Sequence, residues 1–427
     1  MNPAEIKQCY EEFILKPVVN PITIREGKGV KLVDASGKEY LDFTTGGGIS
    51  ILGYNNEYTD YVQEAARKQM KRINHIPHYI YYSEPAAALA EKLAEISPGP
   101  LKKMFFSNSG SEAVEGAIRT ARKYKWRFEL LALQQGFMGR TMGAVSLTGL
   151  SKNKKKIGPL LPGVYHLPAP YCLRCSIRQT YPDCNLACAD YTEDFIEYGT
   201  SDNVASLIME PILGDAGVIM PPDGYFERLV AICRRHDIAL VMDETLTGFG
   251  KTGKMFASEH WGLEPEIMTM GKAIGGGFPL GAFIVTDRVA EVFEYEDFSS
   301  TAGGNPVACA AGLAMIEILQ RERLCEKAAK TGVYLTEELQ CLASDFPILG
   351  EVRGKGLFMG IEIVEGEEKR PSPQKAQEIK RRMVDRGFLF DIFGPSSLRL
   401  TPPLIIERQH VDSFVEALGL VLKEMNG

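Results

Sequence analysis

Lys272 is a residue whose type and position in the sequence could do chemistry. It follows the apolar run IMTM at residues 267–270 and precedes a turn built on Gly275, Gly276, Gly277 and Pro279. Burial lowers the pKa of an amine, and a neutral amine can attack a carbonyl to form a Schiff base. The glycines would let the backbone turn tightly beside a bulky ring. The stretch alone also fits a lysine that extends from a loop into solvent, so its role depends on other residues.

Asp243 ends a second apolar run, ALVM at residues 239–242. An unpaired carboxylate at the end of a buried strand is costly, so we expect a cationic or hydrogen-bonding partner. A protonated pyridine nitrogen would serve, and that pairing makes a pyridoxal ring an electron sink. The alternative is a helix N-cap aspartate.

Ser109, Gly110 and Ser111 open a predicted helix in the segment SNSGSEA. Hydroxyls and free N–H groups at a helix N-terminus favour a phosphate, although a Ser followed by Glu is also an ordinary capping motif. Phe137 and Arg140 follow another predicted strand. The phenyl ring could stack on a planar ring, and the guanidinium could bind a carboxylate.

Glu210 and Asp215 follow the apolar run at residues 205–209. Two acids near a cleft could pair with an arginine that is not holding substrate, or they could be solvated loop residues. A phosphate site, a stacking ring, a buried aspartate and a Schiff-base lysine together are the groups that pyridoxal phosphate needs. The combination is specific where its single members are not.

The elements that must position these residues alternate between strands and helices. This alternation predicts an α/β fold with a mostly parallel sheet covered on both faces, and ligands of such sheets bind beyond the carboxyl ends of the strands. We predict helices at residues 85–96, 112–124, 225–236 and 307–319, and strands at residues 103–106, 130–133, 205–209, 239–242, 267–270 and 282–285.

The predicted domains are an N-terminal arm at residues 1–55 that belongs to a small domain, a large cofactor-binding domain at 56–319, and a C-terminal α+β small domain at 320–427. The arm begins as a helix and continues extended through residues 17–23. A β-hairpin follows, with strands at 30–33 and 40–43. The glycine-rich loop at 44–50 is either a flexible connection or a place where something packs against bare backbone. The C-terminal part contains a strand pair near 352–363, a helix near 374–386 and a strand at 398–400.

The composition is that of an ordinary globular protein, with 427 residues, a formal net charge of −7 and 24% charged residues. The acidic balance argues against nucleic acid and anionic membranes as partners. The N-terminus lacks the apolar core of a signal peptide, and no apolar run approaches the roughly 20 residues that span a bilayer, so we expect a cytoplasmic protein.

Nine cysteines fit free thiols in a reducing compartment. Four of them lie close together in the sequence. Their spacing leaves open a metal site, free thiols or a redox pair, and we assign no metal ligand here. The four are Cys172, Cys175, Cys184 and Cys188.

The ordered motifs of the chain resemble those of the class III pyridoxal-phosphate aminotransferases, such as the 4-aminobutyrate, acetylornithine and ornithine aminotransferases. The resemblance covers nearly the whole length through YLDF, SGSEA, GRT, EP, DETLTGFGKTG, GGGFPLGA, STAGGNPVACA, RGKGL and LRLTPPL. It implies the aspartate aminotransferase fold (fold type I), with a large domain and a smaller α+β domain, and pyridoxal 5′-phosphate as cofactor.

The resemblance also implies roles for single residues. Lys272 would form the Schiff base and move the proton, Asp243 would pair with the pyridinium nitrogen, and Phe137 would stack on the ring. Ser109, Gly110, Ser111 and Glu210 would complete the cofactor site of the same chain.

Further implied roles concern the substrate and the partner subunit. Ser300 and Thr301 would reach the phosphate of the neighbouring protomer, which implies a homodimer, possibly a dimer of dimers. Arg399 would bind one substrate carboxylate and Arg140 a second one.

The sequence departs from the family pattern at four positions. Met138 stands where a histidine is common, and Leu246 stands where a glutamine usually bonds the phenolic oxygen of the cofactor. Phe298 and Ser299 replace a common His-Gly pair. These changes bear on the electronics of the ring and therefore on substrate and reaction type.

We therefore predict an aminotransferase that moves an amino group from an ω- or α-amino acid to a 2-oxo acid by a ping-pong mechanism. The alternative is a racemase or epimerase of the same family. A non-catalytic relative is disfavoured by the intact Lys272 and Asp243, and a Rossmann nucleotide enzyme by the lack of G-x-G-x-x-G after the first strand.

Overall fold

The centre of the fold is a seven-stranded sheet with the strand order β4-β10-β9-β8-β7-β5-β6. The computed structural model describes residues 1–15 and 20–426. The strands from β9 to β6 are parallel, whereas β10 is antiparallel to both of its neighbours. The predicted mostly parallel α/β sheet is therefore confirmed. Its strands are β4 (Leu101–Ser107), β5 (Glu129–Leu133), β6 (Val164–Leu167), β7 (Val204–Met209), β8 (Ala239–Asp243), β9 (Ile267–Met270) and β10 (Gly281–Thr286).

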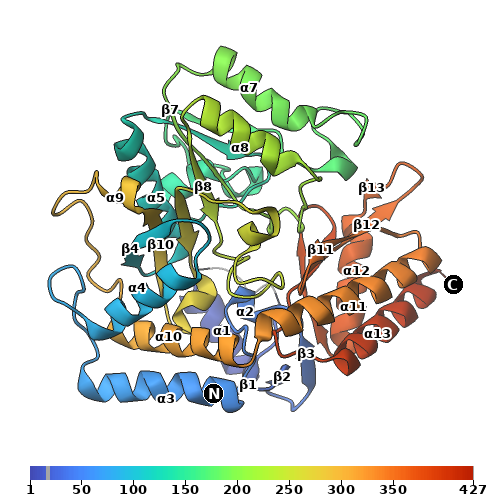
Figure 1. Ribbon diagram of the computed structural model, residues 1–427. Helices are drawn as coiled ribbons and strands as arrows, with labels where there is room; N and C mark the ends of the chain where they lie inside the picture. The colour runs from blue at the N-terminus through green and yellow to red at the C-terminus, as the bar shows by residue number, and fades with distance from the viewer. Residues whose placement is uncertain (16–19, 427) are drawn as a thin grey trace.

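Helices cover both faces of this sheet because its inner strands are apolar on both faces (Figure 1). Leu131 and Leu133 pack with α7 (Ala187–Gly199) and α8 (Tyr225–Arg235), which lie side by side at the top of Figure 1. The alternate residue Leu130 packs on the other face with α5 (Gly110–Lys125). Elsewhere α10 (Pro306–Arg321) packs against α3 (Glu57–Arg72) and α4 (Glu84–Ile96).

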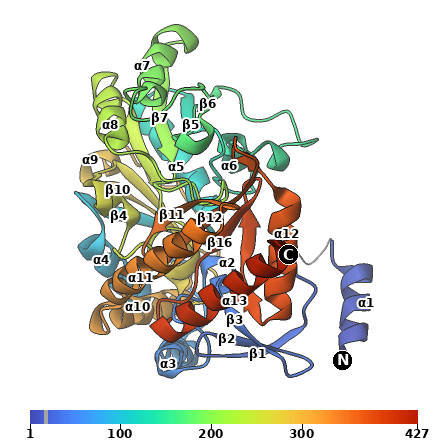
Figure 2. The same ribbon diagram turned by 90° about the vertical axis from the view of Figure 1, so that its right-hand side faces the viewer.

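The C-terminal part forms a second, antiparallel sheet whose main strands run in the order β11-β12-β16-β15. Figure 2 shows its three helices together with the N-terminal strands. The elements are α11 (Leu324–Asp345), α12 (Pro373–Asp385), α13 (Arg408–Asn426), β11 (Leu349–Lys355), β12 (Phe358–Glu365), β13 (Arg370–Pro371), β15 (Asp391–Phe393) and β16 (Ser397–Leu400).

The N-terminal segment joins the C-terminal one in space. Strands β1 (Ile24–Lys28), β2 (Lys31–Asp34) and β3 (Glu39–Asp42) are antiparallel neighbours, and β3 pairs in parallel with β14 (Phe388–Leu389). The predicted hairpin is therefore present. This pairing supports the grouping of residues 1–55 with 320–427, although the domain boundaries remain a prediction.

Three features differ from the expectations or lie outside the described residues. Strand β6 was not predicted, because it is only four residues long and half-buried. The predicted loop at 44–50 contains a single helical turn, α2 (Thr45–Gly48), with left-handed residues inside it. The arm begins with α1 (Pro3–Phe13), but residues 17–19 of its expected extended part lie outside the described residues.

Two further short α-helices are α6 (Met142–Leu147) and α9 (Asp287–Ala290). None of the helices in residues 1–15 and 20–426 has the length and apolar character needed to cross a membrane.

Candidate active site

A cavity of about 200 Å³ lies where the parallel strands β5, β7, β8 and β9 end. This is the edge at which ligands of open parallel sheets bind. Most of the predicted site residues line this one cavity. Its lining comprises Ser109, Gly110, Ser111, Phe137, Met138, Gly139, Arg140, Glu210, Asp215, Asp243, Thr245, Leu246 and Lys272.

Lys272 follows β9 after a single glycine and adopts a left-handed backbone conformation, with φ of 49°. A left-handed conformation is uncommon for a residue other than glycine and is found at functional sites. Burial lowers the pKa of the Lys272 amine, while the carboxylates of Asp243 and Asp215 oppose this shift. The site therefore favours the neutral, nucleophilic amine more than water does.

Asp243 is the last residue of β8, and only 5% of its surface is exposed. Its Oδ1 accepts hydrogen bonds from the Thr245 backbone N–H and the Thr269 hydroxyl, both at 2.9 Å. Burial nevertheless raises the pKa of the Asp243 carboxyl. A cation at the free side of this carboxylate would be stabilised by the pairing.

Thr245 and Thr269 were not singled out from the sequence. Thr269 is the polar residue in the apolar run IMTM. A polar side chain in a buried strand needs a hydrogen-bond partner, and this requirement could have indicated a role for Thr269. Thr245 Oγ1 is buried and has no hydrogen-bond partner in good geometry among the described residues. A buried hydroxyl that lines a cavity is free to bond a ligand.

The segment predicted to hold phosphate lies at the N-terminus of α5. Ser109 is the N-cap residue, and its side chain accepts a hydrogen bond from the Glu112 N–H at 3.3 Å, so the capping alternative is also realised. A Cβ at Gly110 would lie 2.8 Å from Thr245 Cγ2, so only glycine fits there. Ser111 Oγ accepts the Arg140 N–H at 3.0 Å. Ser109, Gly110 and Ser111 line the cavity at this helix N-terminus, where free N–H groups would favour an anion.

Glu210 joins the loop of Phe137 to the end of β7. It accepts the Phe137 N–H at 2.8 Å and the Gly214 N–H at 3.0 Å. Burial raises the pKa of the Glu210 carboxyl to about 8 despite these hydrogen bonds, and the carboxyls of Asp243 and Asp215 act in the same direction. Glu210 therefore positions the Phe137 loop as a largely neutral acid at pH 7.

The two arginines differ in their surroundings. Arg399 is 6% exposed, its Nη1 donates to Asp215 Oδ1 at 2.9 Å, and its guanidinium lies 3.4 Å from the ring centroid of Phe393. Arg140 is exposed and lies 5.3 Å from the ring centroid of Phe137. The sequence left open whether Glu210 and Asp215 pair with an arginine or are solvated loop residues, and Asp215 pairs with Arg399.

Ser300 and Thr301 do not line this cavity. Ser300 Oγ accepts a hydrogen bond from Asn108 Nδ2 at 3.1 Å, and Thr301 is exposed.

Of the four departures from the family pattern, Met138 and Leu246 are buried at the cavity wall and make it apolar.

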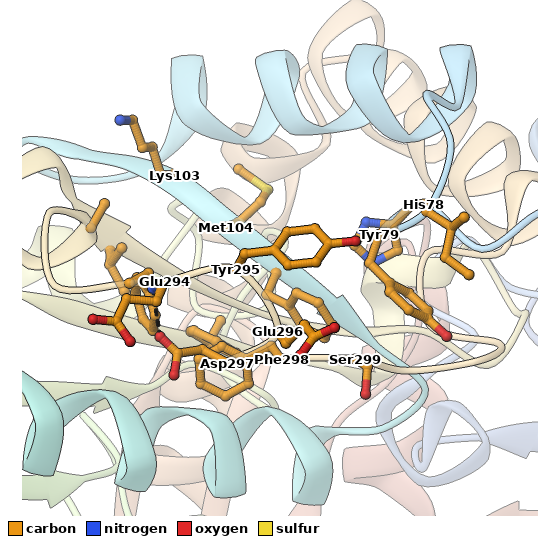
Figure 3. A pocket seen from close by; sticks show the side chains of 16 residues that line it. His78, Tyr79, Lys103, Met104, Glu294, Tyr295, Glu296, Asp297, Phe298 and Ser299 are labelled. Carbon is orange, nitrogen blue, oxygen red and sulfur yellow. Dashed lines mark hydrogen bonds between the residues drawn. The ribbon is translucent and has the colours of Figure 1, made fainter.

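Phe298, the third departure, lies away from the cavity in an aromatic cluster with Phe105 and Phe283. A second cavity, of about 830 Å³, lies beside this cluster (Figure 3). Its walls include His78, Tyr79, Tyr295 and Ser299, and it holds none of the residues predicted to bind cofactor or substrate.

The four clustered cysteines line one small cavity of about 10 Å³ and are free thiols. Burial and the neighbouring thiols raise the pKa of Cys188 to about 11. Within residues 1–15 and 20–426, no group of three or more His, Cys, Asp or Glu residues is arranged to hold a metal ion. The same segment contacts the small sheet, because Arg174 forms an ion pair with the fully buried Glu362 at 3.0 Å.

The cavity residues fit pyridoxal phosphate. The helix N-terminus and the unpartnered Thr245 hydroxyl suit a phosphate, the enclosed Asp243 suits a pyridinium nitrogen, and the Lys272 amine suits a carbonyl. Gly271 leaves room for this close packing, since a Cβ there would lie 3.1 Å from the Gly110 backbone. The fold and the cavity together define a pyridoxal-phosphate enzyme of fold type I.

The comparisons with known proteins identify the family. The model of the family described as Aminotransferase class-III matches residues 15–422. The chain belongs to the class-III aminotransferases and is a pyridoxal-phosphate-dependent transaminase. The family and the cofactor predicted from the sequence are confirmed.

Curated relatives match the chain over its full length. An acetylornithine aminotransferase of Methanothermobacter thermautotrophicus is 36% identical over 426 residues, which is 100% of both chains. A leucine/methionine racemase of Thermococcus litoralis is also 36% identical, over 100% of this chain and 96% of its own.

Solved structures agree on the fold. An (S)-enantioselective omega-transaminase from Thermomicrobium roseum superimposes with a TM-score of 0.93 at 34% identity, over 100% of both chains. An omega transaminase from Pseudomonas jessenii, solved in complex with PMP, gives 0.93 at 29% identity over 98% of both.

Proposed function

We propose that this transaminase moves an amino group from an ω- or α-amino acid to a 2-oxo acid in two half-reactions, and that Lys272 is the residue to which the cofactor is joined. The observation that carries the proposal is the convergence of Lys272, Asp243 and the α5 N-terminus on one cavity. When bound, pyridoxal phosphate supplies a carbonyl that takes up the amino group and a ring that withdraws electrons.

The residues of the chain would divide the work as follows. Ser109, Gly110 and Ser111 hold the phosphate, Phe137 lies against the ring, and Glu210 fixes the Phe137 loop. Asp243 holds the ring nitrogen in its protonated form. Because burial lowers the pKa of the Lys272 amine, its Nζ can take a proton from the substrate carbon and return it.

Substrate carboxylates would bind to the two arginines. Arg399 does not itself line the cavity, but it pairs with Asp215, which does, so a substrate carboxylate would compete with Asp215 for the guanidinium. Arg140 is exposed at the cavity rim and is our candidate for the second carboxylate of a dicarboxylic partner. The acetylornithine aminotransferase relatives, named for an amino acid substrate, support a site for one substrate carboxylate.

A racemase or epimerase is the second candidate. The leucine/methionine racemase relative favours it, as does the apolar wall formed by Met138 and Leu246. A racemase has no use for a second carboxylate site, and the presence of Arg140 at the cavity supports amino transfer.

We further propose that the active enzyme is a homodimer, alone or paired as a dimer of dimers, in which Ser300 and Thr301 reach the cofactor of the partner subunit. An exposed apolar surface beside them supports this proposal, since large exposed apolar patches are commonly covered by another chain. It includes the cavity of Figure 3 and the exposed Tyr81, Tyr82 and Tyr295. The nine free cysteines support a cytoplasmic enzyme of amino acid metabolism.

Borohydride reduction tests the assignment of Lys272. Reduction of the purified enzyme should leave a pyridoxyl mass adduct on the peptide that contains Lys272, and Lys272→Ala should carry none. An adduct on the neighbouring buried Lys251 instead would overturn the assignment.

A further inference from the structure

A second buried lysine lies beside the candidate active site and has no role in the proposed reaction. Lys251 is 0% exposed, and its Nζ donates a hydrogen bond to Thr45 Oγ1 at 3.0 Å. Burial and the nearby cations Arg399 and Lys272 lower the pKa of Lys251 to about 7, and Asp42 opposes them. Both the ammonium and the neutral amine carry N–H groups, so Lys251 can donate to Thr45 in either protonation state.

Thr45 is held in an unfavourable backbone conformation. Its φ is 48°, in the left-handed region, which a β-branched residue rarely adopts. Its side chain is fully buried, and its hydroxyl donates to the Thr44 carbonyl at 2.8 Å while it accepts from Lys251. Backbone strain of this kind persists only where the surrounding structure enforces it, and it is common at functional sites.

The residues that follow Thr45 lie directly against the reactive lysine. Gly46, Gly47 and Gly48 all have positive φ, at 56°, 76° and 97°. A Cβ at Gly48 would lie 2.8 Å from Leu246 Cδ1 and 3.1 Å from Lys272 Cδ. The backbone of this glycine loop therefore forms one wall beside the Lys272 side chain, and any shift of the loop changes the space around that side chain.

We propose that Lys251 is a positioning residue that, through Thr45, holds the glycine loop 46–48 against Lys272 and Leu246. The inference rests on the proposed role of Lys272. Without the Lys251 hydrogen bond, the strained turn at Thr45 can relax, and the loop can leave the side chain that it now confines. A misplacement of about 1 Å near a reacting group costs roughly a hundredfold in rate.

Three variants of the holoenzyme distinguish a loss of loop positioning from a general loss of folding. Lys251→Met removes the donor, and Thr45→Val removes the acceptor while it keeps the side-chain shape. Thr45→Ser keeps the hydroxyl and is the matched control. Hydrogen–deuterium exchange of the peptide that covers residues 44–50 reports the loop directly, and steady-state kinetics report its effect on catalysis.

We expect exchange in residues 44–50 to be about tenfold faster in Lys251→Met and in Thr45→Val, the factor for losing one hydrogen bond to a charged donor. The double variant should equal Thr45→Val, because Lys251→Met then removes a bond that is already absent. In Lys251→Met, Thr45→Val and the double variant, kcat should fall by about tenfold to a hundredfold. Thr45→Ser should stay within about twofold of the parent, since it keeps the bond. Unchanged exchange, or effects that multiply in the double variant, would overturn the proposal. The exchange result does not depend on which reaction the enzyme runs, whereas an absent borohydride adduct on Lys272 would overturn the proposed function itself.

Discussion

Asp215→Asn is the substitution whose effects follow most directly from the geometry of the site. It removes the negative charge that pairs with the buried Arg399 and keeps the size of the side chain. The Nη1–Oδ1 distance of 2.9 Å and the 20% exposure of the Asp215 side chain describe a well-formed and mostly desolvated pair. A substrate carboxylate that binds Arg399 must displace this carboxylate first.

The size of the effect follows from the strength of the pair. A charge-assisted hydrogen bond of this kind contributes about 1.5–3 kcal/mol, and 1.4 kcal/mol corresponds to a factor of about ten. The free enzyme should therefore lose up to about 3 kcal/mol of unfolding free energy. Because the substrate no longer has to break the Asp215–Arg399 ion pair, KM for an amino acid donor should fall by about tenfold to a hundredfold.

The assay compares two donors that differ only in a carboxylate. For an amino acid, Asp215→Asn should lower KM, and for the corresponding amine without a carboxyl group KM should stay within about twofold, because that amine makes no contact with Arg399. An unchanged or higher KM for the amino acid, in a variant that still binds cofactor, would refute the idea that Asp215 competes with substrate for Arg399.

The other predictions concern the rim, the dimer and pH. Arg140→Ala should raise KM for a dicarboxylic oxo acid at least about tenfold, with little change for a monocarboxylic one. Thr301→Ala should weaken cofactor retention by about 1.5–3 kcal/mol, measured by cofactor release, and light scattering of the parent should give a dimer. A fully active monomer would contradict the shared site. Because the folded-state pKa of Glu210, about 8, lies above its ordinary value of 4.5, its stabilising contribution is present below that ordinary value and is lost as pH rises to about 8. Because glutamine does not titrate, Glu210→Gln should flatten this decline in urea unfolding between about pH 5 and 8, and an equally steep decline would contradict the assignment.

The sequence predicted those site residues that directly follow a recognisable apolar strand. Asp243 ends one apolar run, and Lys272 follows another after a single glycine. Continuous apolar runs predict buried parallel strands, and the carboxyl ends of such strands meet at one edge of the sheet. Most strands of the large sheet, and the predicted residues that line one cavity, could therefore be placed without a structure.

Contacts between distant segments could not be predicted in this way. The Arg399–Asp215 pair joins residues 184 positions apart and depends on how the small antiparallel sheet docks on the large one. The sequence left open whether the loop at 44–50 is a flexible connection or a place where something packs against bare backbone, because no local pattern shows that a buried lysine some 200 positions later bonds Thr45. Strand β6 was missed because a short, half-buried strand has too few apolar positions to be recognised.

Single-turnover kinetics with an α-deuterated amino acid and no oxo acid test the central claim most directly. If the chain is a transaminase that uses Lys272, each active site should release one equivalent of oxo acid and then stop, and Lys272→Ala should release none. Loss of deuterium and of optical activity that continues through many turnovers, without any oxo acid product, would contradict amino transfer and identify a racemase.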